Sequence, residues 1–205
     1  MDLPIPCYLN TASMPEELTI GDVEVATIRS LTAWNEAAGL QIFEYAGRIQ
    51  LESPLADDGW NAISFVLTDW LEVTDKLSVN RFIGATTCTW SVRDAIGAPP
   101  RHTFVKNDFL RAFDIVINAE NYRWTIGAKV NRYDLQSTIT HELGHVLSLG
   151  HPDADPRPAD APTMVGRIFP NDTKLRTLEP VDWKSIQTIR LAKLPTASLS
   201  LHKRP

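Results

Sequence analysis

The sequence predicts an α+β fold, and three observations lead to this class. The chain has 205 residues, of which 43% are hydrophobic, so it can fill the core of one domain. Short runs rich in β-branched and aromatic residues are separated by turn residues, as is typical of strands. Longer segments repeat apolar residues every three or four positions, the spacing of a helix that buries one face. About five strands and one helix are therefore expected before residue 134, and two helices after it.

The strands are expected where the short runs rich in β-formers occur. The clearest is an apolar run that ends in turn residues, at 113–118. The complete set of expected strands lies near residues 5–9, 40–45, 61–67, 82–90 and 113–118.

Each of the three expected helices carries a start or stop signal. The first covers about residues 20–38 and is followed by Gly39, a residue that favours helix ends. The second begins after Asp134, which suits the N-cap position. The third begins at Pro180, because proline suits the first turn of a helix.

The bulk properties narrow the class of protein. A formal net charge of −5, with no long run of Lys or Arg, argues against nucleic acid as a partner. No apolar stretch approaches the roughly 20 residues needed to span a membrane. The first residues lack the features of a secretory signal, so either the protein is cytoplasmic or its signal has been removed. Cys7 and Cys88 could form one disulfide or remain two buried thiols, and their number does not decide between these.

Three of the five histidines lie within one short run, at His141, His145 and His151. On a helix, His141 and His145 project from the same face because they are four residues apart. Two neutral imidazoles held in this way suit Zn²⁺, and a third protein ligand leaves one tetrahedral position for water. The run therefore predicts a metal site with His141, His145 and His151 as its ligands.

Glu142 lies next to the first of these ligands and about 100° around the helix, where it can flank the open metal position. An HExxH match arises by chance on the order of once in a hundred chains of this composition, and a third His makes it rarer. The alternative is a buried helix whose histidines form hydrogen bonds in the core. That arrangement is disfavoured, since three titratable rings and a Glu are costly to bury without a metal.

With these residues the chain resembles the metzincin zinc proteases, and within them the matrixins and their bacterial relatives. The metzincin pattern HExxHxxGxxH is matched at the positions named above, and Met164 matches the methionine of a tight turn beneath the metal, the Met-turn. The final helix resembles that of the matrixins at Asp182, which would form a hydrogen bond with the Met-turn. Met164 and Asp182 would thus support the site.

The resemblance also implies a fold and a domain organisation. It implies a twisted, mainly parallel five-stranded sheet with an antiparallel edge strand, two long helices and a small C-terminal lobe with the Met-turn and the final helix. Residues 1–195 would form a single catalytic domain, with an N-terminal subdomain at 1–151, a C-terminal subdomain at 152–195 and a tail at 196–205.

The activity that the resemblance implies is zinc-dependent cleavage of peptide bonds, in which Glu142 activates a zinc-bound water. The partners would be protein or peptide substrates, which would extend along Gly84, Ala85 and Thr86 and contact Arg167. One catalytic Zn²⁺ is expected. The family also implies a secreted protein, which is expected here to be a monomer. A catalytically weak or inactive zinc-binding interaction module remains the alternative.

Some features depart from the family or lack support. The family glycine three residues after the second His is Ser148 here, and a glycine appears at Gly150. Either Ser148 takes a left-handed conformation, at about 1 kcal/mol, or the helix end moves toward Gly150. Calcium is possible in this family, but Asp57–Asp58 and Asp153–Asp155 are too ordinary to indicate a site. His102 and His202 are expected at the surface.

Overall fold

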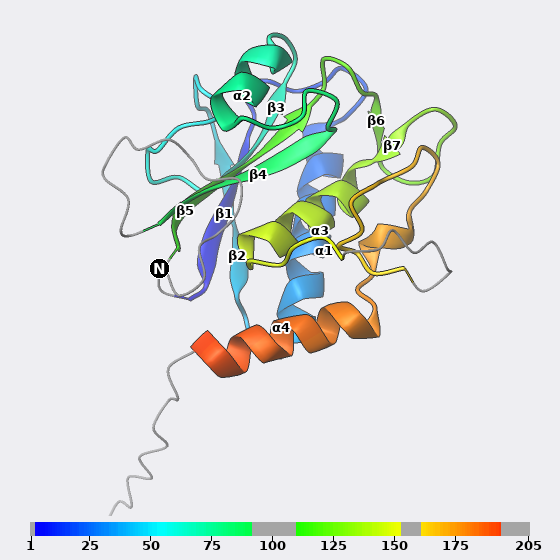
Figure 1. Ribbon diagram of the computed structural model, residues 1–205. Helices are drawn as coiled ribbons and strands as arrows, with labels where there is room; N and C mark the ends of the chain where they lie inside the picture. Colours follow the sequence, from blue (N-terminus) through cyan, green and yellow to red (C-terminus); the bar gives the residue numbers. More distant parts are fainter. Residues whose placement is uncertain (1–2, 92–109, 153–160, 194–205) are drawn as a thin grey trace, which may run out of the picture.

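A computed structural model describes residues 3–91, 110–152 and 161–193 of the chain (Figure 1). Five strands form one sheet in the order β2-β1-β3-β5-β4. Neighbouring strands are parallel except for β4, which pairs antiparallel with β5 at one edge. The expected α+β class and the mostly parallel sheet are confirmed. The five strands are β1 (Ile5–Asn10), β2 (Phe43–Ile49), β3 (Ala62–Val66), β4 (Ala85–Ser91) and β5 (Leu110–Asn118).

Helices cover both faces of this sheet, as Figure 1 shows. On one face lie α1 (Ile20–Ala38) and α3 (Leu135–Val146), and on the other lies the short helix α2 (Trp70–Leu77). Strand β5 alternates between the two cores, because Ile115 and Ile117 pack with α1 and α3, while Val116 packs with α2. Burial on both faces explains the continuous apolar run of this strand.

Helix α1 begins and ends where the sequence predicts. The Thr19 hydroxyl accepts a hydrogen bond from the backbone N–H of Asp22 at 3.1 Å, which caps the first turn. At the other end Gly39 adopts a left-handed conformation with φ of 63°, and its N–H donates to the Glu36 carbonyl.

Helix α3 is fixed at its start by a buried carboxylate. Asp134 is fully buried and accepts hydrogen bonds from the backbone N–H of Ser137 at 2.9 Å and from both Nε and Nη2 of Arg176 at 2.7 and 2.6 Å. Burial opposes ionisation, but Arg176 and the other donors outweigh it and lower the pKa of Asp134. Arg176 belongs to the 3₁₀ turn η1 (Lys174–Arg176), so the pair ties α3 to the C-terminal part of the chain.

The C-terminal part ends in helix α4 (Pro180–Lys193), which begins at the predicted proline. It packs against α1, and Ile186 on its inner face joins the main core. The remaining elements are two strands of two residues each, β6 (Trp124–Thr125) and β7 (Tyr133–Asp134). In the described part of the chain, no helix is long and apolar enough to cross a membrane.

The prediction of one helix before α3 is wrong, because α2 also precedes it. Trp70, Val73 and Leu77 are buried at helical spacing, so the signal was present. The sequence signal for α2 is weak because the helix has only eight residues. In addition, the side chain of its N-cap residue, Asp69, forms no capping hydrogen bond.

The two cysteines do not form a disulfide. Both Cys7 and Cys88 are buried free thiols, and they belong to the cores on opposite faces of the sheet. Burial raises the pKa of Cys7 to about 12, which keeps the thiol protonated at neutral pH.

Candidate metal centre

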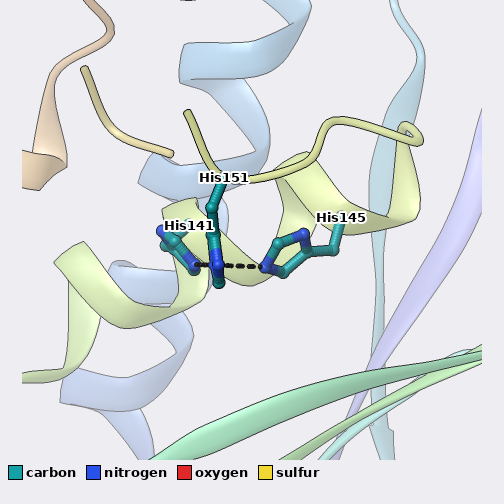
Figure 2. Close-up of side chains that lie close together, drawn as sticks. All are labelled: His141, His145 and His151. Carbon is teal, nitrogen blue, oxygen red and sulfur yellow. Dashed lines mark hydrogen bonds between the residues drawn. The ribbon is translucent and has the colours of Figure 1, made fainter. Parts of the chain in front are cut away.

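The three predicted histidine ligands converge on one point, as Figure 2 shows. The Nε2 atom of His151 lies 3.1 Å from Nε2 of His141 and 3.1 Å from Nε2 of His145. Two nitrogens bound to one tetrahedral Zn²⁺ at 2.0–2.1 Å would be about 3.3 Å apart. The spacing therefore fits three imidazoles that share one ion, and this group could hold a metal.

Backbone carbonyls determine which ring nitrogen carries the proton in two of these residues. Nδ1 of His141 lies 2.7 Å from the Thr163 carbonyl oxygen, and Nδ1 of His145 lies 2.8 Å from the Leu149 carbonyl oxygen. Because a carbonyl can only accept, each Nδ1 must donate, and each Nε2 is left with a lone pair. A proton on Nε2 of His151 could satisfy only one of these two lone pairs, whereas a cation can bind all three rings.

Burial keeps these imidazoles in the form that binds metals. His141 is 5% exposed, and burial, together with the neighbouring His145, lowers its pKa to about 3. Burial also lowers the pKa of His145. Both rings are therefore neutral at physiological pH, and metal ligands must be neutral imidazoles.

The structure shows which of Ser148 and Gly150 ends helix α3. It adopts the left-handed conformation, with φ of 68°, and Gly150 does not. The N–H of Ser148 donates to the His145 carbonyl at 2.9 Å, and the N–H of Leu149 donates to the Gly144 carbonyl at 3.0 Å. These two bonds form a Schellman motif in which serine takes the usual place of glycine. The helix therefore ends before Ser148, and the chain turns so that His151 reaches the other two histidines.

The turn at 162–165 supports the site from below. The N–H of Val165 donates to the Pro162 carbonyl at 3.2 Å and closes this turn. Met164 within it is 4% exposed, and its sulfur lies against Gly144, where an added Cβ would come within 2.2 Å of Sδ. Gly144 is therefore the residue that lets Met164 pack directly under α3.

Asp182 on α4 fixes the same turn. Its Oδ2 accepts hydrogen bonds from the N–H of Thr163 and the N–H of Glu179, both at 2.9 Å. The hydrogen bond between Asp182 and the turn, which the family resemblance implied, is present. Since the Thr163 carbonyl in turn accepts from Nδ1 of His141, α4 holds the first histidine in place through one residue.

Glu142 and the three histidines line one pocket of about 650 Å³. Glu142 is 5% exposed, and the Thr87 hydroxyl lies 2.8 Å from its Oε2. The four residues expected to contact substrate also line this pocket, and their role remains a prediction. They are Gly84 just before β4, Ala85 and Thr86 on β4, and Arg167 after the turn that carries Met164.

The sequence did not single out an aromatic group in the same pocket. Tyr122 and Tyr133 meet edge to face with ring centroids 5.2 Å apart, and Trp124 lies 6.0 Å from Tyr133. Phe82 and Phe169 also line the pocket, and each has an arginine above its ring, Arg81 and Arg167 respectively. The closeness of Tyr122 and Trp124 in the sequence was the available signal, but their position beside the histidines depends on the fold.

Other candidate metal ligands do not join the site. Within the described ranges, only the three histidines form a group suited to a metal. Asp57 pairs with Arg111 at 2.6 Å, and Asp58 accepts from the N–H of Trp60 in a local turn, so neither indicates a calcium site. His102, Asp153–Asp155 and His202 lie outside the described residues.

Comparisons with known proteins add no assignment. No family model matches this chain, and no curated protein matches it.

Replacing Ser148 with Gly tests the helix end. We expect Ser148→Gly to raise the free energy of unfolding by about 0.5–1 kcal/mol, because glycine adopts the left-handed conformation without the steric cost of Cβ. Denaturant unfolding of the metal-free protein measures this. Ser185→Gly in α4 is the control and should destabilise, since Ser185 lies within a right-handed helix. A loss of stability in both variants would contradict the assignment.

A second prediction concerns Gly166, which packs against the His151 ring. A Cβ at Gly166 would lie 3.2 Å from Nδ1 of His151, so Gly166→Ala should shift the ring. We expect the affinity for Zn²⁺ to fall about 10-fold, as for changes that disturb a ligand without removing it. Gly150→Ala is the matched control, because nothing lies within 4 Å of its added Cβ. Calorimetric titration measures both, and equal affinities would show that His151 does not need its present position.

Proposed function

We propose that this protein is a zinc-dependent metalloendopeptidase with a metzincin fold closest to that of the matrixins. The observation that carries the proposal is the convergence of three histidine Nε2 atoms in a pocket that Glu142 also lines. A site that only bound a cation would need only the three histidine side chains. A buried carboxylate beside the rings adds a group that can accept and return a proton.

Zinc is the metal that these ligands favour. Three imidazole nitrogens without a thiolate or a further carboxylate are the donor set of catalytic zinc sites, which keep one position open. When bound, Zn²⁺ would supply Lewis-acid chemistry, by lowering the pKa of water to about 7 and polarising a carbonyl group. Calcium has no comparable support among the described residues.

The residues of the chain would supply the remaining chemistry. Glu142 would take a proton from the attacking water at its carboxylate and pass it to the departing amine, so that one group acts first as base and then as acid. His141 and His145 are oriented by carbonyls at their Nδ1 atoms, and this fixes the direction of both Nε2 lone pairs. Met164 and Asp182 would hold this frame without touching the substrate.

An extended peptide is the substrate shape that the pocket favours. Among the described strands, β4 pairs only with β5 and forms an edge of the sheet. A peptide could add there as a further strand along Gly84, Ala85 and Thr86, with its main-chain groups bonded to β4. Arg167 and the residues after it would form the opposite wall of the pocket. Secretion is the location that goes with this family.

The alternative is an inactive zinc-binding interaction module that keeps the same histidines. The departure from the family pattern at Ser148 does not displace the third histidine, because Ser148 ends α3 in the conformation that brings His151 to the other histidines. Glu142 is also present and lines the pocket. No described feature therefore favours the alternative.

Replacing Glu142 separates catalysis from metal binding. We expect Glu142→Ala to lower the rate of zinc-dependent cleavage of a casein substrate by about 10²-fold or more, because the general base is lost. Zinc content should stay at one ion per chain, as measured by elemental analysis. Glu36→Ala on the exposed side of α1 is the control and should cleave at the wild-type rate.

Two results would contradict the proposal. Undiminished cleavage by Glu142→Ala would show that Glu142 is not the base. A wild-type protein with stoichiometric zinc that cleaves no member of a broad peptide library would favour the interaction module.

A further inference from the structure

Thr87 is a buried residue of the edge strand β4, and the proposed reaction gives it no role. It pairs with Ile115 of β5 and is 1% exposed. Its neighbours on β4 show which way it points. Cys88 belongs to the core on the α2 side, while Ala85 packs against the core on the α3 side. Because side chains alternate along a strand, Thr87 faces α3.

The Thr87 hydroxyl contacts the residue that would act as the base. Its Oγ1 lies 2.8 Å from Oε2 of Glu142 and 2.9 Å from the backbone carbonyl oxygen of the same residue. The hydroxyl has one proton to donate. Oε2 is the closer of the two acceptors, and the carbonyl already lies within the hydrogen-bond ladder of the helix. The proton therefore goes to Oε2.

We propose that Thr87 is a positioning residue, which holds the Glu142 carboxylate in the orientation needed to accept a proton in the pocket. This inference rests on the proposed peptidase function. Glu142 reaches the pocket through three rotatable side-chain bonds, and a hydrogen bond to a rigid strand selects one setting of the carboxylate. Strand β4, which would bind the peptide, would thus also orient the Glu142 carboxylate. The substrate and the base would then be held by the same strand.

The position of Thr87 suits this role better than a general packing role. A residue that only filled space between β4 and α3 could be apolar, as Ala85 is on the same face of the strand. A hydroxyl on that face needs an acceptor, because burial without one is costly. The acceptor that it meets is the single carboxylate among the residues that line the pocket.

The test compares Thr87→Val, which keeps the shape and removes the donor, with Thr87→Ser, which keeps the donor. In the full chain loaded with zinc, Thr87→Val should lower kcat for peptide cleavage about 10- to 100-fold and leave KM nearly unchanged. Thr87→Ser should restore most of kcat. Thr89→Val, on the same face of β4, is the matched control and should keep the wild-type kcat.

Two further measurements separate positioning from a loss of structure. The zinc affinity and melting temperature of Thr87→Val should remain close to those of Thr87→Ser, because the metal ligands are untouched. High-resolution crystal structures of the metal-free proteins should show one orientation of the Glu142 carboxylate in the wild type and a changed or mixed orientation in Thr87→Val. In a Glu142→Ala background, Thr87→Val should have no further effect on cleavage.

The outcomes distinguish this inference from the proposed function. If the wild type cleaves and Glu142→Ala does not, while Thr87→Val keeps full kcat or an unchanged carboxylate orientation, the positioning role is wrong and the peptidase stands. If Thr87→Ser is as impaired as Thr87→Val, the hydrogen bond is not what matters. If the zinc-loaded wild type cleaves nothing, the peptidase proposal fails and this inference fails with it.

Discussion

Neutral imidazole nitrogens whose lone pairs point at one another can be satisfied together by a cation, and the site is organised around this group of three histidines. Carbonyls of Thr163 and Leu149 fix the protons of His141 and His145 on Nδ1, so two Nε2 lone pairs face the same point as the ring of His151. Burial also disfavours protonation of His141 and His145, because an uncompensated charge in the interior is costly. A metal ion satisfies the rings together, which protons cannot do.

The rest of the structure holds the rings in this arrangement. Helix α3 carries His141 and His145, and the ion pair between Asp134 and Arg176 fixes the start of this helix. The position of His151 depends on how the helix ends, and Ser148 determines this end by taking a left-handed conformation. Asp182 reaches the site from α4 by fixing the turn whose carbonyl orients His141. Contacts from α3, η1, α4 and the turn at 162–165 thus bear on one small volume, so the C-terminal part of the chain helps to hold the histidines in place.

The sequence predicted what is encoded locally. Gly39 and Asp134 marked helix boundaries correctly because capping is a short-range interaction. It predicted the three histidines as a group because two of them share a helical face. It missed α2, whose start lacks a side-chain cap, and it could not decide between Ser148 and Gly150, since both can end a helix. The contact of Thr87 with Glu142 joins residues 55 positions apart, and no local pattern indicates it. The division at residues 151 and 152 into two subdomains remains a prediction.

Crystals grown with Zn²⁺ and measured on both sides of the zinc absorption edge test the central claim most directly. We expect one anomalous peak about 2.0–2.1 Å from Nε2 of His141, His145 and His151, with the Nδ1 contacts to Thr163 and Leu149 retained. A folded protein whose three rings point apart, or whose zinc is held by other residues, would contradict it.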